Sequence, residues 1–396
     1  MVEPAVILYP GREKSVLLRH PWIFASAIAS VLGNPAVGET ASVFDSKKQF
    51  IAKAAFSPDS KIRARVWTWN STEVIDREFL KARIKASIER RSIYRKTENT
   101  TALRLVFGEA DGIPGLIVDQ YNNTLVAQIL SAGPERHRQD IFGILEELVK
   151  PDQIYERSDV DVRNLEKLEE RDGIVSGTPL KSNLVITENG VKYSVDVCEG
   201  QKTGFYIDQR RNRNKIKELV KDKDVLNCFC YTGGFTLNAL AGGARTVVSV
   251  DSSAPALEQL KQNIALNGFD ENRNEVIEGD IFKLLRLFRD QAKSFDMIVL
   301  DPPKFAPTVS QAEKAARGYK DINLLAFKLL RPGGILVTFS CSGGISRDLF
   351  QKIITSAAAD AGVDGRIIDQ LSQSPDHPVA LNFPESFYLK GLIVEK

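Results

Sequence analysis

Two apolar segments near the end of the chain each stop at a chemically reactive side chain. Residues 295–300 are followed by Asp301, and residues 335–340 are followed by Cys341. The sequence between them predicts a helix over residues 312–330. A strand, a helix and a second strand in this order form a right-handed crossover, which makes the two strands parallel neighbours. Because ligands of open α/β sheets bind at the carboxyl ends of the strands, we expect Asp301 and Cys341 to share one pocket.

The sequence around this pair alternates between strand and helix about five times after residue 222. Such alternation predicts a doubly wound parallel sheet, the Rossmann-like α/β architecture. At 396 residues the chain is too long for one ordinary core, so a multidomain protein is expected. We place three domains at residues 1–75, 76–183 and 184–396, the last of which opens with a tight hairpin at Asn189-Gly190.

The first two domains have simpler signals. Strands predicted at residues 6–9, 41–44, 50–56 and 62–67 are typical of a small β-barrel. A helix over residues 76–95 follows, with Leu80, Ile84 and Ile88 on one face, and it leads into a middle α+β domain of mixed strands and helices. A second helix is expected from about residue 134 to 149.

The positive charge of the chain is concentrated at its start. Residues 1–105 carry 18 Lys and Arg against 10 Asp and Glu, a net +8, whereas the remainder carries −6. Within the last barrel strand Lys61, Arg63 and Arg65 alternate with apolar residues, which predicts one basic face. A basic patch of this kind fits a polyanion such as nucleic acid. The simpler alternative is a solvated basic surface.

Several classes of protein are excluded by composition. The chain lacks a run of about 18 apolar residues and the features of a signal peptide, so we expect a cytoplasmic protein without membrane partners. Its four cysteines and three histidines do not have the paired spacing of a zinc site, so no metal is expected and the thiols should be free.

A glycine-containing loop and two further acids precede Asp301. Residues 224–236 read as strand, loop and helix, and the loop glycines let a ligand approach the backbone. The next strand ends at Asp251, an acid in the position that usually binds ribose hydroxyls. A third acid, Asp280, follows the strand after that. The alternative is a nucleotide-binding or non-catalytic Rossmann domain.

This succession resembles the Rossmann-like class I methyltransferases that use S-adenosylmethionine (SAM). In that family the first loop holds the methionine end of the cofactor. The acid after the second strand binds the ribose, and the acid after the third strand lies near the adenine. The resemblance implies a cofactor site formed by Asn227, Phe229, Tyr231, Thr232, Gly233, Gly234, Asp251, Asp280, Ile281, Asp301 and Phe205.

An acid beside a thiol suits methylation of a cytosine at carbon 5. A thiolate that adds to carbon 6 makes carbon 5 nucleophilic, and an acid that hydrogen-bonds N3 stabilises the charge of the adduct. Cys341 fits the first role and Asp301 the second as the catalytic pair. The alternative for Cys341 is a small buried hydrophobic residue. Cys198, Cys228 and Cys230 are interpreted as structural.

Longer stretches over nearly the whole chain resemble the bacterial 23S ribosomal RNA 5-methylcytosine methyltransferases. The matching residues are 20–24 (HPWIF), 108–119 (GEADGIPGLIVD), 201–210 (QKTGFYIDQR), 301–305 (DPPKF), 340–342 (SCS) and 376–378 (DHP). The resemblance implies an N-terminal PUA domain that binds RNA, a middle domain, and a C-terminal methyltransferase. It also implies 23S ribosomal RNA or a large-subunit precursor as partner, and a homodimer is one oligomeric state open to the chain.

The same resemblance places the substrate base near the residues Pro302, Pro303, Lys304, Lys202, Tyr206 and Arg210. Many enzymes of this kind carry a second cysteine beside the prolines, and this chain has none there. Two alternatives stay open. Asp-Pro-Pro also resembles the motif of base N-methyltransferases, although Lys304 stands where those enzymes often place an aromatic. The chain could also be a non-catalytic RNA-binding protein of ribosome assembly.

Overall fold

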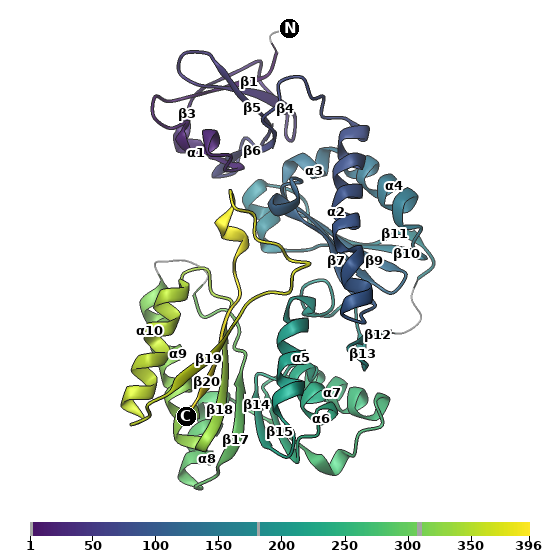
Figure 1. The fold of residues 1–396 in the computed structure, drawn as a ribbon. Helices are drawn as coiled ribbons and strands as arrows, with labels where there is room; N and C mark the ends of the chain where they lie inside the picture. The colour runs from purple at the N-terminus through teal and green to yellow at the C-terminus, as the bar shows by residue number, and fades with distance from the viewer. Residues whose placement is uncertain (1–2, 180–182, 307–310) are drawn as a thin grey trace. The chain divides into compact units, whose positions relative to one another are not determined.

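The computed structural model describes residues 3–179, 183–306 and 311–396 (Figure 1). These residues divide into two compact units. The first comprises Met1–Ile186, Val195–Ile207 and Pro375–Ser386, and the second comprises Thr187–Ser194, Asp208–Ser374 and Phe387–Lys396. Three segments from within the predicted third domain, residues 184–186, 195–207 and 375–386, thus group with the first unit. The boundaries at residues 75/76 and 183/184 stay a prediction.

The N-terminal part of the first unit is a mixed sheet around a small apolar core. Its strand order is β2 (Trp22–Phe24), β6 (Ile62–Thr68), β5 (Phe50–Phe56), β4 (Thr40–Phe44), β1 (Ala5–Leu8) and β3 (Ile28–Leu32), with the short helix α1 (Lys14–Leu17). Each of the four strands expected from the sequence is present. The sequence missed β2 and β3, which are short or largely exposed.

The middle part of the first unit is a second sheet covered by helices. Its order is β11 (Arg171–Gly177), β10 (Gln153–Ser158), β9 (Thr124–Ile129), β8 (Leu116–Tyr121) and β7 (Ala102–Phe107). Helix α2 (Arg77–Thr97) buries Leu80 and Ile84 as predicted, and the Asp76 carboxylate caps it by accepting from Phe79 N. The helix predicted at 134–149 is two, α3 (Ala132–Arg136) and α4 (Arg138–Val149).

The basic face predicted on β6 is wrong at Arg65. This side chain is buried, and its guanidinium lies 2.7 Å from the Glu166 carboxylate. Buried charges need partners, and here the partner comes from about a hundred residues downstream. Arg91 and Arg104 are paired in the same way with Asp111 and Asp119. Part of the excess positive charge of residues 1–105 is therefore neutralised inside the fold.

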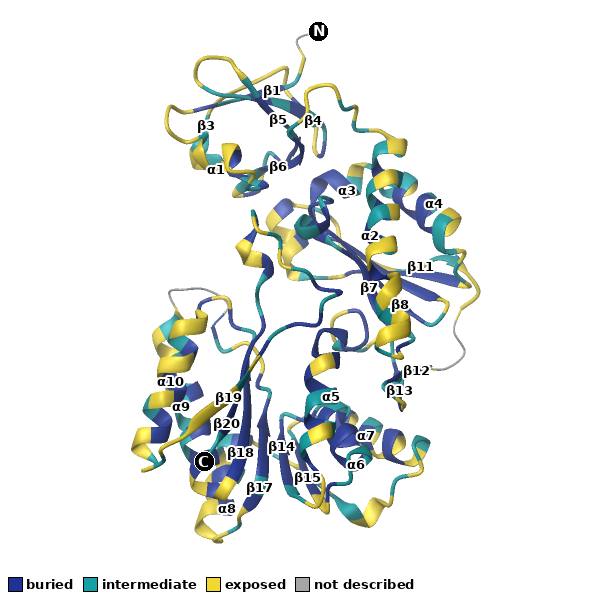
Figure 2. Cartoon of the chain, viewed as in Figure 1, coloured by how far each residue is buried: buried dark blue, intermediate teal, exposed yellow. Residues whose placement is uncertain are grey.

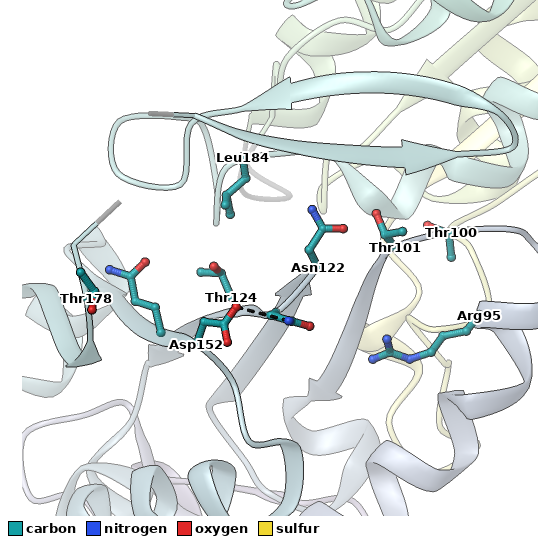
Figure 3. Close-up of a pocket in the computed structure, with 10 residues that line it drawn as sticks. Arg95, Thr100, Thr101, Asn122, Thr124, Asp152, Thr178 and Leu184 are labelled. Atoms are coloured by element: carbon teal, nitrogen blue, oxygen red, sulfur yellow. Dashed lines mark hydrogen bonds between the residues drawn. The ribbon is translucent and has the colours of Figure 1, made fainter. Parts of the chain in front are cut away.

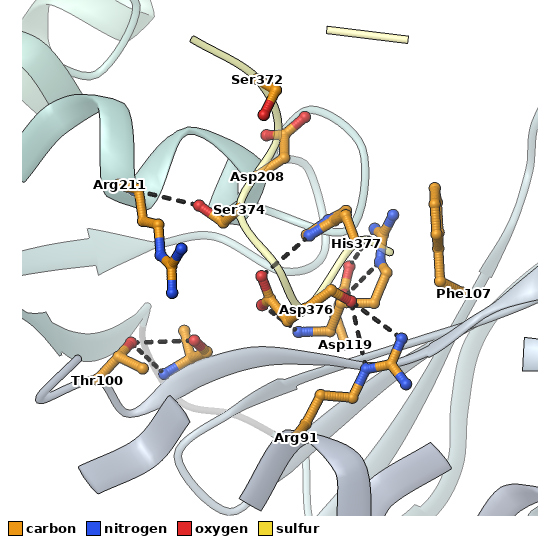
Figure 4. A network of polar contacts seen from close by, with 12 residues as sticks. Arg91, Thr100, Phe107, Asp119, Asp208, Arg211, Ser372, Ser374, Asp376 and His377 are labelled. Atoms are coloured by element: carbon orange, nitrogen blue, oxygen red, sulfur yellow. Dashed lines mark hydrogen bonds and ion pairs between the residues drawn. The ribbon is translucent and has the colours of Figure 1, made fainter. Parts of the chain in front are cut away.

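The segment containing Asp376-His377 is anchored to the middle sheet. The Asp376 carboxylate accepts from Arg104 N at 3.1 Å, and its carbonyl accepts from the Arg91 guanidinium at 3.0 Å (Figure 4). The His377 ring packs against Phe107, and both residue 376 and residue 377 are buried. These contacts explain the Asp-His-Pro stretch by packing alone.

The second unit is built on a doubly wound sheet, as predicted. Its order is β16 (Asn274–Glu278), β15 (Thr246–Asp251), β14 (Asp224–Cys228), β17 (Phe295–Leu300), β18 (Leu330–Ser340), β20 (Lys390–Glu395) and β19 (Arg366–Leu371). Strands β14, β15, β16, β17 and β18 run parallel to one another. Strand β20 runs antiparallel to both of its neighbours, β18 and β19. The sequence pattern did not predict that reversal.

Helices cover both faces of this sheet. On one side lie α5 (Arg210–Leu219), α6 (Gly234–Ala241) and α7 (Ala254–Leu266), and on the other lie α8 (Ile281–Asp290), α9 (Ala312–Leu329) and α10 (Arg347–Asp360) (Figure 1). The strands between them are mostly buried, and the outer helix faces are exposed (Figure 2). The hairpin predicted at Asn189-Gly190 joins β12 (Leu184–Glu188) to β13 (Val191–Val195), with positive φ at both turn residues.

Candidate active site

The strands that precede Asp301 and Cys341 are parallel neighbours, as the sequence predicted. Leu300 of β17 pairs with Thr338 of β18, so both strands end at the same edge of the sheet. The loops that follow are joined by a hydrogen bond of 3.1 Å from Ala306 N to Ser342 Oγ. The acid and the thiol therefore lie on two loops that are held together.

The backbone on both sides of Cys341 is fixed by one tyrosine. The Tyr319 hydroxyl of α9 lies 2.9 Å from Ser340 Oγ and 3.0 Å from Ser342 Oγ. Tyr319 is fully buried, and burial raises its pKa, so the hydroxyl keeps its proton and bonds to the serines. Cys341 is thereby placed at a defined strand end.

The other cysteines differ from Cys341 in ways that matter for reactivity. Burial raises the pKa of Cys228 and Cys230, which keeps these thiols protonated, and a protonated thiol is a poor nucleophile. Cys198 is exposed and belongs to the first unit. Among the described residues, which include all four cysteines, Cys341 is the partly exposed thiol at a strand end of the parallel sheet.

The Asp301 carboxylate has a buried hydrogen-bond partner that the sequence reasoning missed. Gln209 Nε2 donates to Asp301 Oδ2 at 3.0 Å, and Gln209 Oε1 accepts from Asn212 Nδ2. Because Asn212 occupies the amide oxygen, the amide nitrogen of Gln209 is directed at the acid. Gln209 lies in the stretch 201–210 that carried the resemblance, but it was not among the residues predicted from that stretch.

The residues after Asp301 do not present an aromatic ring to a base. Pro302 is buried, and Pro303 and Lys304 are exposed. The Phe305 ring packs 4.7 Å from the ring of Tyr319, next to the apolar core. The position at which N-methyltransferases often place a stacking aromatic is therefore an exposed lysine here, and the following phenylalanine is used in packing.

The predicted cofactor loop has an unusual and well-fixed backbone. Phe229 and Tyr231 have φ of 60° and 50°, in the left-handed region that non-glycine residues rarely adopt. The loop is held by the Asp251 carboxylate, which accepts from Tyr231 N at 2.8 Å and from Ser253 N at 3.0 Å. Such strain is retained where it shapes a site in advance.

The loop glycines lie close to side chains of the protein itself. A Cβ on Gly233, at φ 91°, would lie 2.1 Å from Leu260 Cδ1, and one on Gly234 would lie 3.1 Å from Arg213 Cδ. Asn227 is buried, and among the described residues its Oδ1 has no hydrogen-bond partner. A buried acceptor without a donor at a strand end suits a ligand that brings a donor, such as the amino group of SAM. The Thr232 carbonyl accepts from Asn263 Nδ2.

The last two residues predicted near the adenine have structural roles. Asp280 caps α8 by accepting from Lys283 N at 3.1 Å, and its side chain is otherwise exposed. Ile281 is buried in the core of the second unit. Their part in cofactor binding stays a prediction.

Residues predicted from the stretch 201–210 are divided between the two units. Lys202, Phe205 and Tyr206 belong to the first, where the Lys202 ammonium lies 4.2 Å from the centre of the Tyr206 ring and Phe205 is buried. Arg210 begins α5 in the second and is fully buried. Their contacts with substrate or cofactor stay predictions.

Arg213 of helix α5 is buried in an ion pair with Glu188. Its guanidinium forms two hydrogen bonds, of 2.8 and 2.7 Å, with the Glu188 carboxylate, and both side chains are buried. The pair joins α5 to the hairpin strand β12 next to the cofactor loop.

We expect Arg213→Met to lower the free energy of unfolding by about 3–5 kcal/mol, because the Glu188 carboxylate would stay buried without a partner. Urea unfolding followed by circular dichroism measures this. The double variant Arg213→Met/Glu188→Met is the control and should recover most of the loss. A single variant as stable as wild type would contradict the importance of the pair.

A cavity of about 770 Å³ belongs to the first unit (Figure 3). It is polar and lined by Arg95, Thr100, Thr101, Asn122, Asn123, Thr124, Asp152, Gln153, Thr178 and Leu184. None of these is a predicted site residue. Thr178 and Leu184 flank residues 180–182, which lie outside the described residues, so we assign it no ligand.

The described residues contain neither a metal-binding cluster nor a membrane-spanning helix. No cluster of His, Cys, Asp or Glu in the described part of the chain is arranged to hold a metal ion. No helix in that part is long and apolar enough to cross a membrane.

Comparison with known proteins connects this geometry to methyl transfer. Residues 165–383 match the model of the S-adenosylmethionine-dependent methyltransferase family, and residues 6–69 match that of the PUA-like domain. These matches confirm the predicted fold class and cofactor.

Three curated relatives are similar along the whole chain, and each carries the name ribosomal RNA large subunit methyltransferase I. The proteins from Aeromonas salmonicida and Cronobacter sakazakii are both 50% identical, and that from Pseudoalteromonas translucida is 48% identical. In each case the match covers 98% of this chain and 98% of the relative.

Two solved structures are similar in fold. A methyltransferase solved in complex with SAH has a TM-score of 0.87 at 20% identity. A protein from Streptococcus mutans assigned as a SAM-dependent methyltransferase has a TM-score of 0.85 at 19% identity. Both matches cover 100% of each chain.

We expect Asp251→Ala to weaken SAM binding by about 10- to 100-fold, the loss of one or two hydrogen bonds to a charged group. The variant removes the predicted ribose contact and also the acceptor that fixes Tyr231 N. Isothermal titration calorimetry with SAM measures the change. Asp251→Asn, which keeps one acceptor oxygen, should lose less, and equal affinity for Asp251→Ala and wild type would exclude a cofactor role for this acid.

Proposed function

Because the chain belongs to the ribosomal RNA large subunit methyltransferase I family, we propose that it methylates carbon 5 of a cytosine in 23S ribosomal RNA through a covalent adduct of Cys341. SAM is the proposed methyl donor, held by the loop from Asn227 to Gly234 and by Asp251. Asp301 is proposed to bind the base.

The observation that carries the proposal is the meeting of two strand-end loops. Asp301 and Cys341 follow neighbouring parallel strands, and the hydrogen bond from Ala306 N to Ser342 Oγ holds their loops together. The buried thiols of Cys228 and Cys230 are poor candidates for a nucleophile. An acid and an accessible thiol at one sheet edge are what attack on a pyrimidine requires.

The proposed reaction consists of addition of the thiolate, transfer of the methyl group and elimination of the thiolate. The Cys341 thiolate forms a bond to carbon 6 of the cytosine, and the electron pair of the C5–C6 double bond shifts toward carbon 5 and N3. Asp301, in its protonated form, would donate a hydrogen bond to N3 and so stabilise that charge. SAM supplies the electrophilic methyl group that carbon 5 takes up. S-adenosylhomocysteine would be the leaving group of that transfer. Solvent would then take the proton from carbon 5, and the electron pair of the broken C–H bond would restore the double bond and expel Cys341 as thiolate.

The base has to leave its stack to reach this edge. Extrusion of a base costs a few kcal/mol, which contacts in the pocket must offset. Pro302 and Pro303 restrict the loop that would receive the base, since each fixes its own φ. Lys304, Lys202, Tyr206 and Arg210 are proposed substrate contacts on the strength of the family resemblance.

N-methylation of a base amino group is the enzymatic alternative. It needs no thiol and is usually accompanied by a stacking aromatic near the acid. Here Lys304 is exposed and Phe305 packs against Tyr319, which favours carbon 5. A non-catalytic assembly factor is the second alternative, and the pre-shaped cofactor loop argues against it.

The partner is proposed to be 23S ribosomal RNA or its precursor particle, because the relatives act on large-subunit RNA by name and residues 6–69 form a PUA-like domain. Arg12, Lys14, Arg19, Lys47, Lys48 and Lys61 are exposed basic residues of that domain. A cytoplasmic location fits such a substrate, and a homodimer stays a hypothesis.

The test is identification of the methylated nucleoside. Purified protein, labelled SAM and unmodified ribosomal RNA are incubated, and the RNA is digested and analysed by liquid chromatography with mass spectrometry. Label in 5-methylcytidine is expected. Label in an N-methylated nucleoside would replace the proposal with the N-methylation alternative. An absence of label with both naked RNA and precursor particles would favour the assembly factor.

A further inference from the structure

A buried lysine, Lys390, contacts the backbone of the residues on either side of Cys341. Lys390 begins β20 and pairs with Ser340, the residue before Cys341. Its ammonium donates a hydrogen bond of 2.8 Å to the carbonyl of Ser342, the residue after Cys341. Only 4% of Lys390 is exposed, so water screens its charge poorly. Lys390 is thus tied to both neighbours of the thiol.

The charge of this lysine acts on Cys341. Burial lowers the pKa of Lys390 to about 8, the Cys341 thiolate acts in the opposite direction, and the Lys304 ammonium acts in the same direction as burial. An interaction between two titrating groups is mutual, so a thiolate that favours the ammonium is equally favoured by it.

We propose that Lys390 is the positioning residue that holds a cation beside Cys341 and so keeps its sulfur in the thiolate form that attacks cytosine. This inference rests on the proposed function for its catalytic meaning. No redox or covalent change occurs at the lysine: the thiol proton passes to solvent, and the ammonium keeps its own proton. A cation in this place lowers the pKa of a nearby thiol below the ~8.5 of a free cysteine, which would make Cys341 reactive at neutral pH.

The charged and titratable groups around the pair define the pH range. Lys304 follows β17 and adds positive charge, whereas Asp301 on the same loop, when ionised, opposes it. Tyr319 of α9 stays neutral because burial raises its pKa. Since Lys390 loses its proton near pH 8, its effect on the thiol is present below that pH and fades above it.

The experiment measures the pH dependence of Cys341 alkylation without SAM or RNA. Iodoacetamide is reacted with the full-length protein between pH 5 and 10, and modification of Cys341 is followed by peptide mass spectrometry. In Lys390→Met the midpoint should rise by on the order of one pH unit or more. Lys390→Arg should restore most of the wild-type profile, because it keeps a cation.

Lys396→Met is the matched control. Lys396 follows the same strand, its pKa is also lowered by burial, and its ammonium bonds to the carbonyls of Phe327 and Leu330 at the other end of β20. Its substitution should leave the Cys341 midpoint unchanged. Equal midpoints for wild type and Lys390→Met would overturn the proposal.

If Lys390→Met does not fold, the variant Lys390→Gln and the midpoint of the wild-type protein still test the proposal. Lys390→Gln keeps a donor for the Ser342 carbonyl and removes only the charge. If neither neutral variant folds, a wild-type midpoint at or above ~8.5 overturns the proposal by itself, and a lower one supports it. Because the assay needs no substrate, its failure is distinguishable from failure of the proposed function, which would appear as methyl transfer without Cys341.

Discussion

Cys341→Ala is expected to lower methyl transfer to 23S ribosomal RNA by at least about 10³-fold, because the reaction loses its nucleophile. SAM affinity should stay within a few-fold of wild type, since Cys341 is not among the predicted cofactor residues. The fold should be retained, because the thiol is partly exposed and Tyr319 bonds to the serines on either side of it. Transfer of labelled methyl groups and calorimetric titration with SAM measure the two effects.

Cys198→Ala is the matched control for that variant. Cys198 is exposed and lies in the first unit, far in sequence from Asp301 and Cys341. Its removal should therefore leave the rate of methyl transfer unchanged. Cys341→Ser should be nearly as inactive as the alanine variant, since a hydroxyl is not ionised at neutral pH. Full activity of Cys341→Ala would end the covalent mechanism.

Asp301→Asn is expected to lower kcat by about 10²–10³-fold, the usual cost of removing one group that stabilises charge in the transition state. The substitution keeps the size of the side chain and an oxygen for Gln209 Nε2 at 3.0 Å, so the main change is the loss of the carboxyl proton that would be shared with N3. Single-turnover rates with saturating SAM and RNA measure the effect on the chemical step.

Gln209→Leu is the comparison for the acid. Gln209→Leu leaves the Asp301 carboxyl group in place and removes only the amide that orients this group. We therefore expect a smaller loss of rate than for Asp301→Asn and no change in SAM affinity. If Asp301→Asn weakens SAM binding and leaves the single-turnover rate unchanged, Asp301 belongs to the cofactor site and base recognition has to be assigned to another residue.

The crossover that joins β17 to β18 could be predicted because its signals are local. Apolar strands of five or six residues and a helix with helical periodicity stand in a fixed order, and such units have one hand. Asp301 and Cys341 are therefore brought to one edge by rules that need no knowledge of distant contacts. The same reasoning predicted Asp251 at the end of β15.

Charged residues were harder to predict, because their partners are distant in sequence. Arg65 looked like part of a basic face, yet its partner Glu166 lies about a hundred residues away. Arg213 forms a buried pair with Glu188, which lies 25 residues away in the sequence. Periodicity tells which face of an element is apolar, but it does not show which charged side chains will be buried as pairs.

Lys390 and Gln209 show why the rest of the site was missed. Lys390 lies next to Ser340 and Ser342 because β20 runs antiparallel beside β18, and no crossover pattern predicts that strand. Gln209 reaches Asp301 from the start of helix α5, about ninety residues earlier in the chain. Both are ordinary polar residues whose roles come from tertiary contacts.

The most direct test of the account is a covalent complex with RNA that contains 5-fluorocytosine at the target position. Fluorine at carbon 5 cannot leave as a proton does, so the bond between sulfur and carbon 6 should persist after methyl transfer. The account predicts an adduct that is stable to denaturation, depends on SAM, and maps by mass spectrometry to Cys341. An adduct at another residue, or methylation of the RNA without any adduct, would contradict it.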